Sequence, residues 1–319
     1  MPAATGRHVL SDRRNEPITL PPDVDIHDRC LQLRDGRQLT YTDLGDPEGT
    51  PVLFAHGMPG SRLEGWFFHQ QARRHHFRII TPDRPGIGGS TFQPNRTLLD
   101  YPRDVEQLAD ALGIDRFIHA GWSSGGTRTL ACGYALPERV IQAVVMSSYT
   151  HFEEYPGTRA FLQATRWPGP KLAKMGFSIM RAVVAVIVWL AQRHPGLYFR
   201  EAKQMISEQD HELLSSFMRG ELFRRDQNLC LASGGRAIAM DLQTELINWG
   251  FNLSDVSVPV YLYQGGQDPF VPEEYAHHLN AHLPSADLQL LPDAGHLYPL
   301  AESFQAGLFS RLQETLKYG

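Results

Sequence analysis

A serine, an aspartate and a histidine each follow a predicted strand in this chain. Together these three side chains can carry out nucleophilic catalysis. Ser123 is the central residue of Gly121 to Gly125, which reads Gly-Trp-Ser-Ser-Gly. A Gly-x-Ser-x-Gly pattern between a predicted strand and a predicted helix indicates a sharp turn that raises the serine hydroxyl above the end of a sheet. Glycines suit both ends of such a turn because it leaves no room for side chains. We therefore expect Ser123 to be a nucleophile.

A serine hydroxyl needs a base that takes its proton and an acid that orients the base. Asp268 follows a predicted strand in the segment 265–269, and His296 follows the last predicted strand. Both therefore lie at carboxyl ends of strands, where open α/β sheets place their sites. We expect Asp268 to orient His296, because Asp241 lies within a predicted helix and Asp293 is too close along the chain to approach the imidazole from the proper side.

The elements that must position these residues follow a strand–helix alternation. Short apolar runs predict strands, and apolar residues at helical spacing predict helices. This alternation predicts a mostly parallel sheet flanked by helices, and Asp35-Gly36 between two alternating runs predicts an initial hairpin. The expected strands are 30–33, 38–41, 51–55, 77–81, 117–120, 140–146, 258–264 and 288–291, and the expected helices are 62–75, 100–112, 127–135, 236–249, 272–282 and 304–316.

The alternation stops after Ser147 and resumes near residue 236. Residues 148–235 contain helical patterns without a clear strand, so we expect a helical insertion in one α/β core formed by residues 28–147 and 236–319. Residues 1–27 carry charges and prolines but little apolar periodicity, which predicts an N-terminal arm.

One segment of the insertion, Ala182 to Ala191, is apolar on all faces, and such a helix must bury most of its surface. It either packs the insertion on the core or forms a substrate wall, a dimer contact or an interfacial surface. We expect it to line the entrance above Ser123, with Trp189 at the substrate. Trp122 and Phe270 are expected near the pocket because they neighbour the candidate catalytic residues. The segments 168–170 and 195–196 contain Pro and Gly, which suggests the bounds of a moving unit.

The amino-acid composition excludes several classes of protein. The 319 residues are 42% hydrophobic and 20% charged, as in globular proteins. With 30 Lys and Arg against 35 Asp and Glu, the net charge of −5 disfavours a nucleic-acid partner. The three cysteines are sparse and form no Cys-x-x-Cys pair, so we expect neither disulfides nor zinc, and the histidine pairs 75–76 and 277–278 lack a metal-binding motif. We expect no metal and no cofactor.

The apolar runs also bear on location. No apolar signal core follows the first residues, and the longest apolar run is shorter than the roughly 20 residues of a bilayer span. We expect a cytoplasmic protein without a membrane span.

Over residues 28 to 318 the sequence resembles the α/β-hydrolase fold superfamily. The resemblance implies that fold, and the insertion 148–235 then matches the position of a helical cap or lid. The order Ser, Asp, His along the chain is the order of that superfamily. Its His-Gly-x-Pro-Gly loop implies an oxyanion hole formed by the N–H groups of Met58 and Ser124. The segments that carry the resemblance are 56–60 (His-Gly-Met-Pro-Gly), 83–90 (Asp-Arg-Pro-Gly-Ile-Gly-Gly-Ser), 121–125, 265–272 and 295–296.

These residues predict a serine hydrolase that cleaves a carboxylic ester or related acyl compound through an acyl-enzyme, with a small apolar ester-like substrate. Serine at the elbow disfavours the epoxide hydrolases and haloalkane dehalogenases of this fold, which carry aspartate there. Carbon–carbon bond hydrolysis, acyl transfer and cofactor-free oxygen chemistry remain alternatives on the same triad. So do an aminopeptidase that binds an amine through Glu153 and Glu154, and a small-molecule receptor with slow hydrolysis. A homodimer through the apolar helix is also compatible with the sequence.

Overall fold

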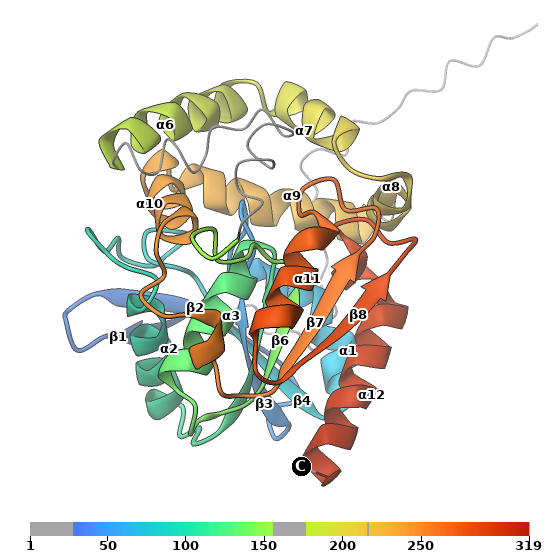
Figure 1. Ribbon diagram of the computed structural model, residues 1–319. Coiled ribbons are helices and arrows are strands. Elements are labelled where there is room, and N and C mark those ends of the chain that lie inside the picture. Colours follow the sequence, from blue (N-terminus) through green and yellow to red (C-terminus); the bar gives the residue numbers. More distant parts are fainter. Residues whose placement is uncertain (1–27, 156–176, 216, 319) are drawn as a thin grey trace, which may run out of the picture.

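An eight-stranded sheet forms the centre of the computed structural model, which describes residues 28–155, 177–215 and 217–318 (Figure 1). The strand order is β1-β2-β4-β3-β5-β6-β7-β8. β2 pairs antiparallel with β1 and β4, and the remaining neighbours pair in parallel. The strands are β1 (Arg29–Gln32), β2 (Gln38–Gly45), β3 (Thr50–Ala55), β4 (Phe77–Pro82), β5 (Phe117–Trp122), β6 (Val140–Met146), β7 (Val260–Gly265) and β8 (Ala286–Leu291).

The inner strands are mainly apolar on both faces because both faces of the sheet are covered. In β3, Leu53 and Ala55 pack into one hydrophobic cluster, while Val52 and Phe54 pack into another on the opposite face. Successive side chains of a strand point to opposite faces, so a strand with helices on both sides has no polar face.

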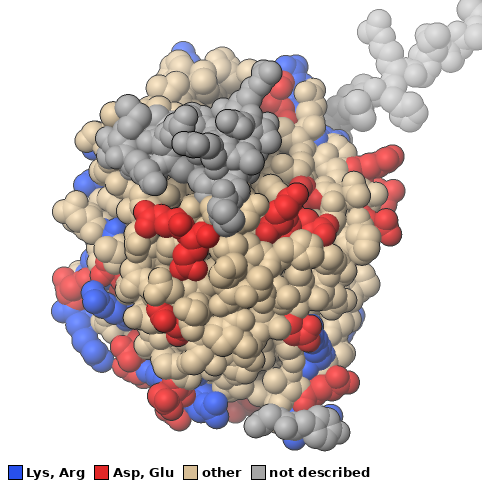
Figure 2. Space-filling model, in the orientation of Figure 1, with Lys and Arg blue, Asp and Glu red and all other residues tan. Residues whose placement is uncertain are grey.

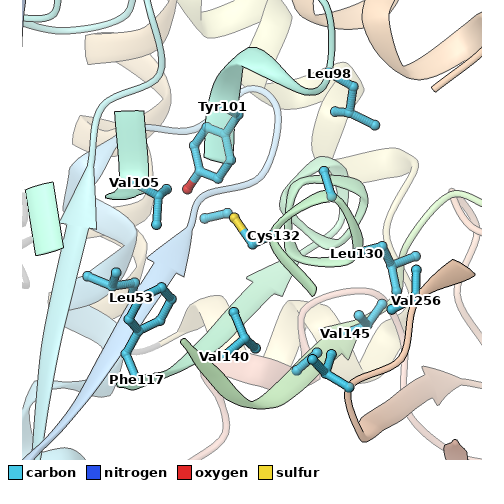
Figure 3. Close-up of a cluster of buried hydrophobic side chains, with 14 of the residues drawn as sticks. Leu53, Leu98, Tyr101, Val105, Phe117, Leu130, Cys132, Val140, Val145 and Val256 are labelled. Atoms are coloured by element: carbon cyan, nitrogen blue, oxygen red, sulfur yellow. The ribbon is translucent and has the colours of Figure 1, made fainter. Parts of the chain in front are cut away.

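Helices cover each face of the sheet (Figure 1). One hydrophobic cluster joins the sheet to α2, α3 and α11. Figure 3 shows Val105 of α2 near Leu53 and Phe117 of the sheet, and Leu130 of α3 near Val145 of β6. The other joins the sheet to α1 and α12. These helices are α1 (His69–Arg74), α2 (Asp100–Ala111), α3 (Ser124–Ala135), α11 (Glu273–His282) and α12 (Glu302–Tyr318).

The predicted hairpin, the inner strands and the core helices are confirmed, with shifted ends. The predicted helix 62–75 is a 3₁₀ helix, η1 (Arg62–Phe68), followed by the short α1. The predicted helix 127–135 begins earlier, at Ser124, because the turn at Ser123 leads directly into it.

A layer of helices lies above the carboxyl ends of the parallel strands (Figure 1). We call α6 to α9 the helical layer; α10 follows it and packs against α6. The bounds are α6 (Phe177–Arg193), α7 (Pro195–Gln204), α8 (Glu208–Ser215), α9 (Phe217–Ala232) and α10 (Gly235–Leu246). The expected N-terminal arm 1–27 and the segment 168–170 lie outside the described residues.

The expectation that the apolar helix buries most of its surface is not met among the described residues. Met180, Val184 and Val188 of α6 are buried in a cluster with α9 and α10. Val186 and Trp189 are 58% and 57% exposed. The buried positions repeat every four residues, so only one side of the helix faces the layer below it.

Within the described chain, no single helix has both the length and the hydropathy of a bilayer span; α6 and α7 reach them only together, across a bend of 109°. Figure 2 shows Asp and Glu side chains both below the helical layer and, interspersed with Lys and Arg, around the lower rim of the core on the visible face.

Candidate active site

Ser123 occupies the turn between β5 and α3. Its φ of 55° and ψ of −123° are unusual for a residue with a side chain, and such strain is typical of functional sites. The Ser123 N–H donates to the carbonyl of Met146 at the end of β6, 2.8 Å away. The turn therefore holds the serine at the carboxyl end of the sheet.

The two glycines of this turn are required by close backbone contacts. A Cβ atom at Gly121 would lie 2.2 Å from the carbonyl oxygen of Gly125, and one at Gly125 would lie 2.0 Å from the carbonyl oxygen of Ala55. Neither distance is sterically possible. The expectation that both ends of the turn must lack side chains is confirmed.

Asp268 and His296 are in direct contact. His296 Nδ1 donates to Asp268 Oδ2 across 2.7 Å, and the other carboxylate oxygen accepts the N–H groups of Phe270 and Val271, each at 2.9 Å. Burial raises the pKa of Asp268, but His296 and the two N–H donors outweigh it and leave this pKa below its ordinary value. A buried, ionised carboxylate thus faces the imidazole.

The neighbouring aspartates are engaged elsewhere or face solvent. Asp241 is a buried partner of Arg84, Arg96 and Arg128, and Asp293 is exposed. The structure therefore brings His296 together with Asp268 rather than with either of the other two.

Aromatic rings surround the imidazole of His296. The Phe270 ring meets it edge-on, with centroids 5.2 Å apart, and the Trp122 ring lies 5.6 Å from it. The indole N–H of Trp122 donates to the carbonyl of His296 at 3.1 Å. Both aromatic residues expected near the pocket lie at the histidine.

A cavity of about 590 Å³ opens between the core and the helical layer. A cavity of this size accommodates a small organic molecule. Trp189 does not line it and is exposed on the outer side of α6, because the inner side of that helix is used to pack on α9 and α10. Its lining includes Ser123, His296, Met58, Trp122 and Phe270, and from the helical layer Tyr198, Ile206, His211, Leu214 and Phe223.

Two backbone N–H groups, those of Met58 and Ser124, are without acceptors among the described residues. Met58 lines the cavity, and Ser124 is the first residue of α3, where N–H groups lack partners within the helix.

The hydroxyl of Ser124 belongs to a buried ionic network that the sequence analysis did not find. It accepts from Arg84 Nη1 at 2.6 Å and donates to Glu245 Oε1 at 2.5 Å. Arg84 also donates to the carbonyl of Gly57 at 2.7 Å and pairs with Asp241. Arg84 thus ties the nucleophile turn to the loop 56–60. Its signal in the sequence is a charged pair, Asp83 and Arg84, that follows a buried strand.

A second buried group, also missed, is the carboxyl of Glu64. It lines the cavity, is 3% exposed, and accepts the N–H of Gly57 at 2.8 Å. A methyl group on Gly57 would lie 3.2 Å from Glu64 Oε1 and 3.5 Å from Ser123 Cβ, so this carboxyl and the serine are adjacent across Gly57. Burial and the nearby carboxyl of Asp226 raise the pKa of Glu64 well above its ordinary value.

Asp226 of α9 meets the end of the same loop. Its Oδ1 accepts the N–H and the hydroxyl of Ser61, at 2.8 and 2.6 Å, while its buried Oδ2 has no hydrogen-bond partner. Burial raises the pKa of Asp226 to about 8. No sequence motif surrounds Asp226, so the sequence gives no signal for its role.

Glu153 and Glu154 do not line the cavity. Glu153 accepts from Asn248 at 2.8 Å, and Glu154 accepts the N–H of Leu253 at 3.2 Å. Both glutamates hold the chain that follows α10.

The described cysteines are free thiols. In the part of the chain that the structure describes, no three His, Cys, Asp or Glu side chains form a group that could hold a metal ion.

Comparisons with known proteins identify the family and the fold. A sequence model of the alpha/beta hydrolase fold family matches residues 50–301. The uncharacterized hydrolase YcgS of Bacillus subtilis is 28% identical over 274 residues, which span 82% of this chain and 89% of that protein. A proline iminopeptidase of Xanthomonas citri is 25% identical over 307 residues, 87% of this chain and 93% of that one. A thermophilic esterase from Thermogutta terrifontis superposes with a TM-score of 0.66 at 19% identity, covering 91% of this chain and 99% of that chain.

The predicted fold is thus confirmed by the sheet topology, and the match spans most of the chain. This protein belongs to the α/β-hydrolase family.

Proposed function

We propose that this protein is a serine hydrolase that cleaves a carboxylic ester or related acyl compound, with Ser123, His296 and Asp268 as its catalytic triad. The observation that carries the proposal is the 2.7 Å contact between His296 and Asp268 beside a cavity that Ser123 also lines. The unusual backbone of Ser123 supports its role as nucleophile, because the turn presents the hydroxyl to the cavity.

In the proposed reaction, Ser123 Oγ attacks the acyl carbonyl as His296 Nε2 takes its proton. Asp268 accepts the Nδ1–H and so keeps the imidazole in the tautomer with a free Nε2. His296 then returns the proton to the leaving alcohol. Water, deprotonated by the same imidazole, releases the acid and restores Ser123.

The negative oxygen of the tetrahedral intermediate would accept the N–H groups of Met58 and Ser124. Support comes from their lack of other acceptors in the described chain and from the position of Met58 at the cavity. A donor in such a position typically contributes about 10² to 10³ in rate. Arg84 supports both donor segments, since it bonds the Ser124 hydroxyl and the Gly57 carbonyl.

The cavity walls favour an apolar substrate. Trp122 and Phe270 lie beside the histidine, and Ile206, Leu214 and Phe223 extend an apolar surface along the helical layer. Burying apolar groups there contributes about 25 cal/mol per Å². We therefore propose an ester with an apolar acyl or alcohol group.

The test is labelling by a fluorophosphonate probe together with a series of p-nitrophenyl esters of increasing acyl length. Ser123→Ala should abolish labelling and lower kcat by about 10⁶. Asp268→Asn should lower kcat by about 10⁴ because the imidazole loses the acceptor for Nδ1–H.

Matched controls are Ser257→Ala and Asp293→Asn, two exposed positions. Both should keep the labelling and the rate of the unmodified protein. Labelling that persists in Ser123→Ala would place the nucleophile elsewhere and end the proposal.

A second candidate is an aminopeptidase, and two observations favour it. The Xanthomonas proline iminopeptidase aligns over 87% of this chain, and the cavity contains the buried carboxyl of Glu64 next to Ser123. Turnover of prolyl-p-nitroanilide that is lost when the amine is acetylated would select this candidate. Turnover of esters alone would select the first.

A further inference from the structure

His296 is held at its main chain by a carboxylate of the helical layer. Asp210, in the first turn of α8, is fully buried. Its Oδ2 accepts the N–H of His296 at 2.9 Å, and its Oδ1 accepts the N–H of Leu297 at 2.8 Å. Among the described residues, the only other hydrogen bond that its side chain accepts comes from the N–H of Ser207, at 3.4 Å. Consecutive backbone N–H groups thus provide most of the hydrogen bonding of this buried carboxyl group.

The loop before His296 is shaped for this carboxylate. A Cβ atom at Gly295 would lie 2.3 Å from Asp210 Oδ2 and 2.1 Å from the hydroxyl oxygen of Ser207. Any side chain at position 295 would therefore push α8 away from the loop. The glycine before the histidine is required by α8, which the sequence places far away.

Three fixed partners then define the position of His296. Asp210 holds its N–H, Trp122 holds its carbonyl, and Asp268 holds Nδ1 of its ring. Only Nε2 remains for proton transfer. An error of about 1 Å in placing a catalytic group costs about 10² in rate.

The helical layer also holds the loop on the other side of the cavity. Asp226 of α9 accepts both the N–H and the hydroxyl of Ser61, which follows the loop 56–60. Two buried carboxyl groups from adjacent helices thus reach the two loops beside Ser123. Neither contact survives if α8 and α9 lift away.

We propose that Asp210 is a positioning residue for His296, and that α8 is a fixed part of the active site rather than a lid that opens during turnover. This inference rests on the proposed function. It goes beyond the triad because a residue of the helical insertion would position the catalytic histidine. Substrate then enters without displacement of α8.

The test compares Asp210→Asn with Glu208→Gln, an exposed neighbour in the same helical turn. Asparagine offers one acceptor and turns its amide N–H₂ toward the second backbone N–H. Asp210→Asn should lower kcat by about 10- to 100-fold with little change in KM. Glu208→Gln should change neither.

A second readout does not depend on a substrate. The Nδ1–H proton between His296 and Asp268 should give a low-field NMR signal in the unmodified protein and in Glu208→Gln. The signal should shift or broaden in Asp210→Asn. If Asp210→Asn does not fold, Gly295→Ala provides the same perturbation from the other partner, with the same expected kcat and NMR changes.

An Asp210→Asn protein with unchanged kcat and an unchanged low-field signal would overturn the proposal, as would loss of stability alone with both readouts intact. Failure of the proposed function is recognised separately, because the unmodified protein would then not react with the fluorophosphonate probe. In that case the NMR comparison still decides whether Asp210 positions His296.

Discussion

The carboxyl of Asp226 should make the stability of this protein fall as the pH rises from 5 to 7. In the folded protein burial raises its pKa to about 8; the hydrogen bonds from Ser61 oppose this effect, Asp83 adds to it and Arg84 opposes it. In the unfolded chain the same group titrates near pH 3.9. Between about pH 4 and pH 8 the folded protein therefore holds a proton that the unfolded chain has lost.

The magnitude follows from proton linkage. Each pH unit inside this window reduces the free energy of unfolding by up to about 1.4 kcal/mol per proton. From pH 5 to pH 7 the loss is about 2 to 3 kcal/mol. Below the unfolded pKa both states are protonated and the loss vanishes; above the folded pKa both are ionised and it stays constant.

Asp226→Asn isolates this contribution because asparagine does not ionise. Its oxygen can still accept from Ser61, and its amide takes the place of the unpartnered Oδ2. The assay is urea unfolding followed by tryptophan fluorescence at pH 5, 6 and 7 and constant ionic strength. Asp226 raises the pKa of Glu64 only when it is itself ionised. Between pH 5 and 7 Asp226 holds its proton, so the titration of Glu64 cancels from the difference between the two proteins.

The expected result is that the unfolding free energy of the unmodified protein, relative to Asp226→Asn, falls by about 2 to 3 kcal/mol over this range. The exposed control Asp293→Asn should show a difference that does not change with pH. A flat difference for Asp226→Asn would mean that this carboxyl is ionised in the folded protein near neutral pH, and the argument from burial would be refuted.

Three further substitutions test the packing around the site. Gly125→Ala should destabilise the fold by about 3 kcal/mol or more, because the methyl group would lie 2.0 Å from the Ala55 carbonyl oxygen; a melting temperature within a few degrees of the unmodified protein would contradict this. Ser124→Ala should cost about 1 to 3 kcal/mol in chemical unfolding, since Arg84 and Glu245 lose a buried partner; an unchanged midpoint would show that the network closes without the hydroxyl. Trp189→Ser should change the unfolding free energy by no more than about 0.5 kcal/mol and leave KM unchanged, because the ring is 57% exposed and outside the cavity; altered acyl-length preference would return this residue to the substrate site.

Local chemistry in the sequence was enough to predict the core and the residues at its edge. Continuous apolar runs such as 51–55 require a sheet covered on both faces, and two glycines around Ser123 require a turn without side chains. Asp268 and His296 each follow a strand, and the carboxyl ends of parallel strands meet at one edge. Their contact is therefore a consequence of topology that the alternation already implied.

The packing of the helical insertion was harder to predict from the sequence. A helix has several faces, and the sequence does not show which face packs against a neighbouring element. The apolar run 182–191 predicts burial, but α6 packs through Met180, Val184 and Val188 and leaves Trp189 outside. Which side of α6 is covered depends on where α9 and α10 lie.

Only the tertiary structure could reveal the buried carboxyl groups that support the site. Asp210 lies 86 positions from His296, and Asp226 lies 165 from Ser61. A single charged residue within a helix resembles any solvent-facing residue of an amphipathic segment. Its role is decided by the fold, because a carboxylate becomes a main-chain acceptor only when packing removes it from water and brings unpaired N–H groups within reach.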